Sequence, residues 1–323
     1  MTSAPAVPSR ARPAVLVVAT LALFLVWSHT FLAFEVLLAP ARGDAPLAWL
    51  DLVVARMVPV AVVCAAWCFG ARRAASLAIL RRHPVRLLVC GLMSVPLYNG
   101  VLYYGIGHHV SGPVASLLTT LSPLYLVVLG WAFLGERLTV RKGAGLALGL
   151  AGVVVIALAK TAGAPASPGA VALVAAAPLA WSVHTALTKQ VAHEHAPVLW
   201  TYLVLVVGAL PLLPLLPWHG APALARLDAK GLLLLAYLVL FATVGGNAVW
   251  TWLLRHLPAS TVGLTIFLNP PLTTAGKWVL SRVRPDAFTF AITPQEWVGG
   301  AISLVGVAVA VLRRPRPRTP TGP

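Results

Sequence analysis

The sequence predicts an all-α polytopic membrane protein with ten transmembrane helices, and three observations lead to this fold class. Of the 323 residues, 59% are hydrophobic and only 10% are charged, whereas a water-soluble domain carries about a quarter charged residues. Apolar runs of about 20 residues, long enough to cross a bilayer core, recur along the whole chain. These runs do not alternate as the strands of a membrane barrel do, so helices are favoured.

The ten expected helices follow one another with short connections. The first is too long for the apolar region of a signal peptide, and no small-x-small cleavage site follows it. The second carries Cys64 and Cys68, which lack partners at metal spacing and are expected to pack as small apolar residues. The fifth contains Gly145-x-x-x-Gly149, which allows two helices to approach closely. The expected spans are 14–38, 47–69, 86–107, 112–134, 143–160, 168–189, 197–217, 231–254, 260–280 and 295–312.

The positive charge of the chain, +16 in total, is distributed unevenly between the two sides of such a bundle. Sixteen of the 24 Lys and Arg residues fall on the side of the two termini, six fall on the other side, and Arg56 and Lys277 lie within spans. This asymmetry predicts a multi-pass protein of the cytoplasmic (inner) membrane with both termini in the cytoplasm, and it removes the reason to expect nucleic acid as a partner. Residues 1–13 are expected to form a cytoplasmic tail, and the basic tail 313–323 is expected to be disordered and to contact anionic lipid.

The chain also repeats itself. Trp27 recurs 154 residues later as Trp181, each followed by Ser, and Asn99 recurs 148 residues later as Asn247. A repeat of five helices is odd-numbered, so the second copy crosses the membrane in the opposite direction. The segments 14–160 and 168–312 are therefore predicted to be inverted halves. Secondary transporters use this architecture for alternating access around a site near the membrane midplane.

Residues 115–158, which read ASLLTTLSPLYLVVLGWAFLGERLTVRKGAGLALGLAGVVVIAL, carry a family resemblance. Pro123, the FLGERLT exit and the glycine-rich fifth helix resemble the EamA type of the drug/metabolite transporter superfamily, as does an Arg early in the second span, Arg56. The resemblance covers nearly the whole chain and implies two inverted EamA repeats of five helices that export small metabolites across the cytoplasmic membrane. The second half departs from the pattern, because it has neither the Glu of GER nor an Arg that matches Arg56.

Polar and aromatic side chains inside the spans are the candidate substrate-binding residues. A polar group without a partner is costly in a membrane, so such groups face the bundle interior or a wet cavity. The alternatives are hydrogen bonds between helices for the polar residues and plain packing for the aromatic rings, which can also stack on planar or cationic substrates. The candidates are Trp27, His29, Tyr98, Asn99, Tyr103, Trp181, His184, Asn247, Trp250 and Asn269.

Charged residues within the spans are candidates for coupling and charge recognition. Glu35, seven residues after Ser28 and on the same face of the first helix, is the candidate for proton coupling; its alternative role is an anchor at the outer membrane surface. Arg56 and Lys277 are candidate counter-charges for a substrate carboxylate, or else structural partners of Glu35 or Asp51.

The two histidines among the candidates titrate near neutral pH and so could carry protons. A neutral, hydrogen-bonded ring is the alternative for both His29 and His184. At 100° per residue, Trp181 and His184 share a helix face whereas Trp27 and His29 do not. The two histidines are therefore not strict repeat partners.

Two polar clusters in the connections are not expected to be sites. Glu136, Arg137, Arg141 and Lys142 are interpreted as a topology lock and salt-bridge cluster. The run His193-Glu194-His195 lacks the i, i+4 histidine pair of a zinc helix and is interpreted as a loop. The sequence thus indicates neither a metal nor a cofactor.

The sequence predicts a secondary transporter that exports a small metabolite or an amino acid by alternating access, and not an enzyme. No phosphate loop is present, which argues against an ATP-driven pump. One alternative is a membrane-embedded enzyme acting on lipid-linked substrates, for which eight Asp and Glu residues form too few acidic clusters. The other is a facilitated-diffusion carrier without ion coupling. The expected partners are a small-molecule substrate and membrane lipid, and the oligomeric state is left open.

Overall fold

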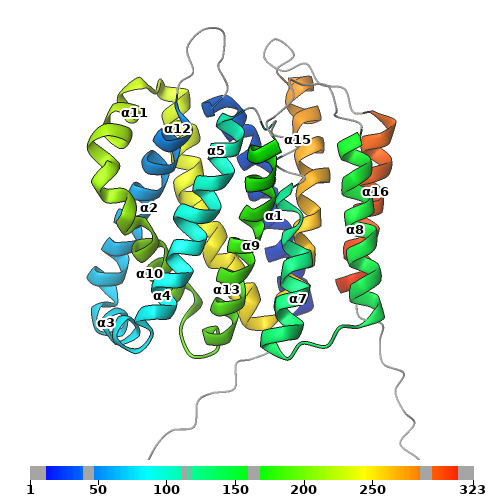
Figure 1. Ribbon diagram of the computed structural model, residues 1–323, viewed down its shortest axis with the longest axis horizontal. Coiled ribbons are helices and arrows are strands. Elements are labelled where there is room, and N and C mark those ends of the chain that lie inside the picture. The colour runs from blue at the N-terminus through cyan, green and yellow to red at the C-terminus, as the bar shows by residue number, and fades with distance from the viewer. Residues whose placement is uncertain are drawn as a thin grey trace, which may run out of the picture.

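The computed structural model describes residues 12–38, 47–108, 110, 115, 118–158, 168–283 and 293–311. The predicted tails 1–13 and 313–323 lie almost wholly outside the described residues, and so do the side chains of Glu35 and Lys277. Every regular element within these ranges is helical, and none is a strand. The helices run side by side (Figure 1), so the all-α fold class is confirmed.

The first half of the chain contains three long helices, a helix of 13 residues, a short surface helix, and a stretch that changes from α-helix to π-helix and back without a break. Its elements are α1 (Pro13–Leu38), α2 (Trp49–Ala71), α3 (Arg73–Arg82), α4 (Pro84–Leu92), the π-helical η1 (Met93–Gly100), α5 (Val101–Gly107), α7 (Ser122–Leu134) and α8 (Val140–Leu158). In Figure 1, α3 marks one end of the bundle and α11, from the second half, marks the other.

The second half follows the same order with more changes of helix type. Its elements are α9 (Pro168–Val191), α10 (Pro197–Ala209), the 3₁₀-helical η2 (Leu210–Leu215), the π-helical η3 (Leu216–Gly220), α11 (Ala221–Arg226), α12 (Ala229–Tyr237), the π-helical η4 (Leu238–Gly245), α13 (Gly246–His256), α14 (Ala259–Leu264), the 3₁₀-helical η5 (Thr265–Leu268), α15 (Asn269–Val283) and α16 (Pro294–Val311).

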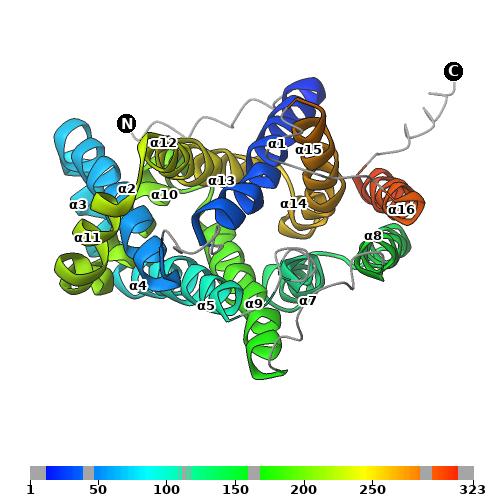
Figure 2. The same cartoon turned by 90° about the horizontal axis from the view of Figure 1, so that it is seen from above.

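Six described stretches are long and apolar enough to cross a membrane, where the sequence predicts ten. The 13-residue α7 is apolar, but at 1.5 Å per residue it spans only about 20 Å of a core about 30 Å thick. The helices α8, α15 and α16 stand beside the six (Figures 1 and 2). The six stretches are Pro13–Thr30, Trp49–Ala71, Pro84–Gly107, Pro168–Val191, Pro197–Arg226 and Ala229–His256.

The pair α8 and α16 is held by close backbone contact. A Cβ added to Gly306 would lie 2.6 Å from the backbone nitrogen of Gly149, and one added to Gly152 would lie 2.5 Å from the carbonyl oxygen of Gly299. The Ser303 hydroxyl donates a hydrogen bond to the Gly149 carbonyl oxygen at 3.4 Å. The close approach expected from the glycine spacing is therefore present, and it joins one helix from each half at the edge of the bundle (Figure 2).

A π-helical turn occurs in the corresponding helix of each half, in η1 and in η4. In η1 the Asn99 side-chain nitrogen donates to the Ser94 carbonyl oxygen at 2.7 Å, and in η4 the Thr243 hydroxyl donates to the Leu238 carbonyl oxygen at 2.7 Å. Both bonds reach back five residues, the same spacing as the backbone bonds of a π-helix. The two turns place polar side chains of both halves toward the middle of the bundle.

Candidate functional site

A cavity of about 90 Å³ lies between the two halves and holds room for several water molecules. Its walls come from both halves: α1, α2, η1, α5 and α7 in the first, and α9, α10, η4, α13, η5 and α15 in the second. Seven of the residues singled out from the sequence line it: Trp27, Arg56, Tyr98, Asn99, Trp181, Asn247 and Asn269.

Arg56 is the charged residue of the cavity wall, and it is 6% exposed. Its Nε donates to the Thr243 hydroxyl at 2.9 Å, and its Nη1 donates to the Tyr103 hydroxyl. The Tyr103 hydroxyl in turn donates to the Asn99 side-chain oxygen at 3.3 Å. The guanidinium also lies 5.4 Å from the ring centroid of Phe34, within the range of a cation–π contact.

No described carboxylate neutralises Arg56, and the suggested pairing with Asp51 is wrong. Asp51 instead accepts a hydrogen bond from His219 Nδ1 at 2.8 Å and pairs with Arg226. Asp51 lies at the start of α2, where η3 and α11 pack, more than one helical turn from Arg56. The guanidinium therefore presents its charge to the cavity with hydroxyl and aromatic partners alone, and its Nη2 donates to no described group.

Three indole rings and one phenol ring pack together on another side of the cavity. The ring centroids of Trp27 and Trp181 are 5.7 Å apart, those of Trp27 and Trp250 are 5.4 Å apart, and those of Tyr98 and Trp181 are 5.2 Å apart. All three pairs are tilted or edge-on, which are favoured aromatic geometries. Trp27 is further fixed because its Nε1 donates to the Ala242 carbonyl oxygen at 2.9 Å. The cavity therefore has a rigid aromatic wall.

Two polar atoms of cavity-lining residues are buried without a hydrogen-bond partner among the described groups, namely Asn269 Oδ1 and Ser94 Oγ. A buried polar atom without a partner costs free energy. Both atoms can accept a hydrogen bond from an ammonium or amide group, since Asn oxygens and Ser hydroxyls are acceptors. Within the described part of the chain, the cavity thus combines a cation that no carboxylate neutralises with two acceptors that have no partner.

Three other predicted binding residues are buried beside the cavity but do not line it. Tyr103 holds Arg56, as described above. Trp250 packs behind Trp27 and Trp181, and its Nε1 donates to the Thr185 hydroxyl at 3.3 Å. The His184 ring lies 5.4 Å from that of Trp181, and its Nδ1 has no partner in the described part of the chain.

His29, a candidate for substrate binding, is not among the residues that line this cavity. Its Nδ1 bonds to the Leu25 carbonyl oxygen at 2.7 Å, and its Nε2 approaches Gly276 of α15. The physical reason is the helix turn: His29 is about 200° around α1 from Trp27, which does face the cavity.

Some residues that line the cavity were not predicted from the sequence, among them Thr30, Phe34 and Ser94. Phe34 and Thr30 follow Trp27 at helical spacing, so the same face of α1 could have revealed them. Ser94 carried no comparable signal, because its position depends on the π-helical turn.

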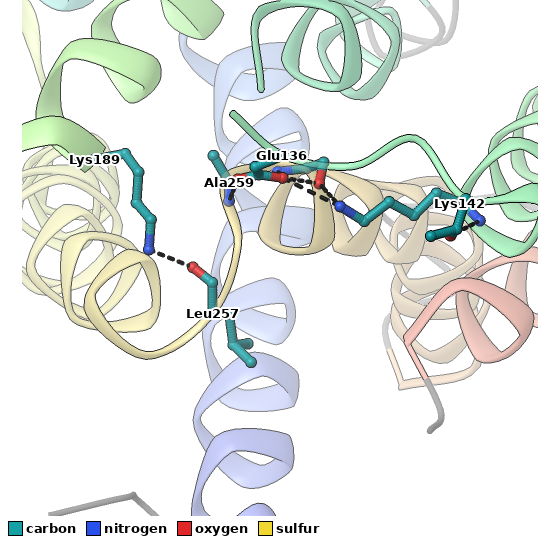
Figure 3. Close-up of polar contacts among 7 residues, drawn as sticks. Glu136, Lys142, Lys189, Leu257 and Ala259 are labelled. Atoms are coloured by element: carbon teal, nitrogen blue, oxygen red, sulfur yellow. Dashed lines mark hydrogen bonds and ion pairs between the residues drawn. The ribbon is translucent and has the colours of Figure 1, made fainter. Parts of the chain in front are cut away.

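A second polar cluster lies at the α3 end of the bundle and joins the two halves (Figure 3). Glu136, in the turn after α7, accepts hydrogen bonds from the backbone nitrogens of Ala259 at 2.5 Å and Ser260 at 3.2 Å, where α14 begins. The Lys142 ammonium lies 3.2 Å from the same carboxylate. Lys189 donates to the Leu257 carbonyl oxygen at 2.8 Å, just past the end of α13. Charged side chains thus satisfy backbone groups at helix ends.

The profile of the EamA-like transporter family matches this chain twice, over residues 12–158 and 168–312. The chain belongs to the EamA-like transporter family. The predicted resemblance is thereby confirmed, and the two matches show that the EamA domain is duplicated. A solved crystal structure is similar in fold, with a TM-score of 0.68 at 21% identity, covering 93% of this chain and 97% of the other.

Three curated relatives of this EamA-like transporter carry the names of exporters or efflux pumps. A probable terminal-alkyne amino-acid exporter of Streptantibioticus cattleyicolor is 30% identical, over 88% of this chain and 89% of the relative. A probable amino-acid metabolite efflux pump of Salmonella typhimurium is 27% identical over 65% and 71%. The pseudopaline exporter CntI of Pseudomonas aeruginosa is 27% identical over 75% and 79%. Family and relatives indicate a multi-pass membrane exporter of small molecules rather than an enzyme.

Proposed function

We propose that this EamA-like transporter exports a small metabolite of the amino-acid type across the cytoplasmic membrane by alternating access. The observation that carries the proposal is Arg56, a buried guanidinium on the wall of a cavity shared by both halves, with no carboxylate partner among the described residues. Two of the relatives above are named as a probable amino-acid exporter and a probable amino-acid metabolite efflux pump.

A buried cation needs a counter-charge, and a substrate carboxylate would supply it. The guanidinium geometry matches a carboxylate, to which it donates charge-assisted hydrogen bonds. Arg56 already uses Nε and Nη1 on Thr243 and Tyr103, so Nη2 is the group left for a substrate. Asn269 Oδ1 and Ser94 Oγ offer acceptors for an ammonium group, and the aromatic wall offers apolar area for a side chain.

The arrangement of the two halves supports alternating access. The repeat-related pairs Trp27 and Trp181, and Asn99 and Asn247, line one cavity although each pair is about 150 residues apart in sequence. We take the bundle to be ten helices in two inverted repeats of five, with α7, α8, α14–α15 and α16 as the four spans beyond the six long apolar stretches. The α3 end of the bundle then faces the cytoplasm, as the distribution of Lys and Arg indicates.

The test compares transport of carboxylates and matching amines in proteoliposomes. Radiolabelled amino acids should be transported, and the same compounds without the carboxylate should neither be transported nor compete. Arg56→Met should lower transport per folded molecule at least about tenfold, which corresponds to about 1.4 kcal/mol of binding. Arg226→Met is the matched control, because Arg226 pairs with Asp51 outside the cavity; it should transport normally.

Two results would overturn the proposal. Equal transport by the Arg56→Met variant, normalised to folded protein, would show that the guanidinium is not the carboxylate site. Equal transport of amines and amino acids by the unmodified protein would show that the substrate does not need a carboxylate.

Tyr103→Phe separates the charge of Arg56 from the hydroxyl that positions it. This variant keeps the Arg56 charge and removes the hydroxyl, so it should weaken transport less than Arg56→Met does.

A further inference from the structure

Three side chains of metal-binding type meet at the α3 end of the bundle, from positions more than 100 residues apart in sequence. His83 lies between α3 and α4, and Glu194 and His195 lie in the turn between α9 and α10. Their ligand atoms all lie within 4.8 Å of one another. His83 Nε2 is 3.5 Å and His195 Nε2 is 4.0 Å from Glu194 Oε2. The sequence run His193-Glu194-His195 alone does not have this geometry, because the third group comes from the first half of the chain.

Both imidazole Nε2 atoms are buried and have no hydrogen-bond partner in the described part of the chain. A buried ring nitrogen without a partner costs free energy, so such a nitrogen usually has a hydrogen bond or a bound ion. Neither distance to Glu194 is short enough for a good hydrogen bond, since those lie near 3 Å. The two nitrogens and the carboxylate therefore lie close together without a short hydrogen bond between them.

One buried indole fixes the orientation of both rings. His195 stacks on Trp200 with ring centroids 6.1 Å apart and planes within 6°, and His83 meets the same ring edge-on at 6.0 Å. Trp200 is 1% exposed, and its Nε1 donates to the Thr188 hydroxyl at 3.2 Å. The packing on Trp200 thus holds both rings with their Nε2 atoms beside the Glu194 carboxylate.

We infer that His83, Glu194 and His195 form a binding site for a divalent transition-metal ion such as Zn²⁺. Two imidazoles and one carboxylate are a known protein ligand set for zinc, with water in the fourth position. At ordinary zinc–ligand distances the three ligand atoms would lie about 3.4 Å apart, so small side-chain rotations close the site. A bound ion would link the α3–α4 turn of the first half to the α9–α10 turn of the second.

Arg82 competes with a metal for the same carboxylate. Its Nη2 lies 3.3 Å from Glu194 Oε2, and its side chain is 69% exposed. A cation at the site must displace this guanidinium or share the carboxylate with it. If the three residues bind a metal, removing Arg82 should therefore raise the affinity for that metal. If they form only an ion-pair cluster, removing Arg82 should leave metal affinity no higher and should weaken the cluster.

The experiment titrates the purified full-length protein, free of any affinity tag, with Zn²⁺ by calorimetry and with Co²⁺ by visible absorption. The expected result is one high-affinity ion per chain, bound at least about tenfold more weakly after His83→Gln or His195→Gln, the scale seen when a metal site is perturbed. His193→Gln is the matched control, since His193 lies in the same turn but interacts with Lys189, Arg255 and His256; it should bind as the unmodified protein does. Arg82→Gln should bind more tightly.

Two outcomes would overturn the inference. Equal Zn²⁺ affinity in the unmodified protein and both histidine variants would place any bound zinc elsewhere. Unchanged or weaker Zn²⁺ binding by Arg82→Gln, together with a lower melting temperature in the absence of metal, would show an ion-pair cluster only. Because Arg82 is exposed, this second arm remains informative even where a histidine variant fails to fold.

Discussion

The contacts of Arg56 show how a buried positive charge is stabilised in the cavity wall. Two hydroxyl acceptors, from Thr243 and Tyr103, and the ring of Phe34 offset part of the cost of removing the guanidinium from water. None of the three carries a negative charge. A site of this kind gains most from an anionic ligand, which makes the charge of the substrate the first property to measure.

At the same scale, the two repeat-related asparagines should respond differently to replacement by leucine. The Asn247 side chain makes one hydrogen bond within the described part of the chain, from Nδ2 to the Thr243 carbonyl oxygen at 2.9 Å. The Asn99 side chain donates to the Ser94 carbonyl oxygen within the π-helical turn and also accepts from Tyr103. Asn247→Leu should lower transport about tenfold while changing the unfolding free energy by only about 1 kcal/mol. Asn99→Leu should lower both. Transport per folded molecule and melting in detergent measure the two effects.

A contrary result is easy to recognise for these asparagines. If Asn247→Leu melts well below the unmodified protein yet transports normally per folded molecule, Asn247 is a packing residue. The assignment of a substrate contact to it then fails.

Proton coupling remains a prediction for Glu35, whose side chain lies outside the described residues. A carboxylate in dry surroundings has a raised pKa and can load and release a proton near neutral pH. Glu35→Gln, which cannot titrate, should therefore flatten the pH dependence of transport. His29→Gln should leave that dependence intact, because His29 is bonded to the Leu25 carbonyl and is not among the residues that line the cavity. Transport rates across a pH series check both; a profile flattened only by His29→Gln would move the proton site.

At the scale of elements, most helix positions could be predicted from the sequence, whereas the stretches of 3₁₀- and π-helix could not. The predicted span 168–189 corresponds to α9 (Pro168–Val191), and 231–254 corresponds to the stretch Ala229–His256, because a continuous apolar run of about 20 residues is itself the signal of a spanning helix. The π-helical turns η1 and η4 were not predicted. They depend on side-chain bonds to carbonyls, such as Asn99 to Ser94, which hydrophobicity does not encode.

The turn after α7 was predicted to be a topology lock, and its contacts give it a more specific role. Gly135, at φ 65°, ends α7 and directs Glu136 toward the first turn of α14. Glu136→Gln should destabilise the protein by about 1.5–3 kcal/mol, the range for hydrogen bonds to a charged group, because it weakens the bonds to Ala259 and Ser260 and leaves Lys142 without its ion-pair partner. Thermal unfolding in detergent measures the change.

The neighbouring Arg137 is the matched control for that turn, since its side chain is exposed. Arg137→Gln should leave the unfolding free energy within about 0.5 kcal/mol, as for other surface substitutions. Equal melting of the Glu136→Gln and Arg137→Gln variants would contradict a stabilising contact between the halves.

At the scale of the whole molecule, contacts between distant segments explain what the sequence could not reveal. Thr243 lies 187 residues from Arg56, and His83 lies more than 100 residues from Glu194. No spacing rule connects such positions; only the packing of one half against the other brings them together. The repeat could be recognised in the sequence, because its motifs occur in both halves. A cavity shared by the two halves could therefore be predicted, but the contacts between its residues could not.

The arrangement of the whole chain in the membrane gives the last prediction. The α3 end of the bundle carries Arg81, and α12, which begins next to α11 at the opposite end, carries Lys230 (Figure 1). Both side chains are exposed. From the excess of Lys and Arg on the side of the termini, we expect α3 in the cytoplasm and the start of α12 outside.

With Cys64, Cys68 and Cys90 replaced by alanine, an impermeant maleimide should label Lys230→Cys in intact cells and Arg81→Cys only after the membrane is opened. Labelling in the reverse order would invert the orientation while preserving the fold. Labelling of both cysteines from the outside would contradict the bundle itself, because α3 and the start of α12 would then share one side of the membrane.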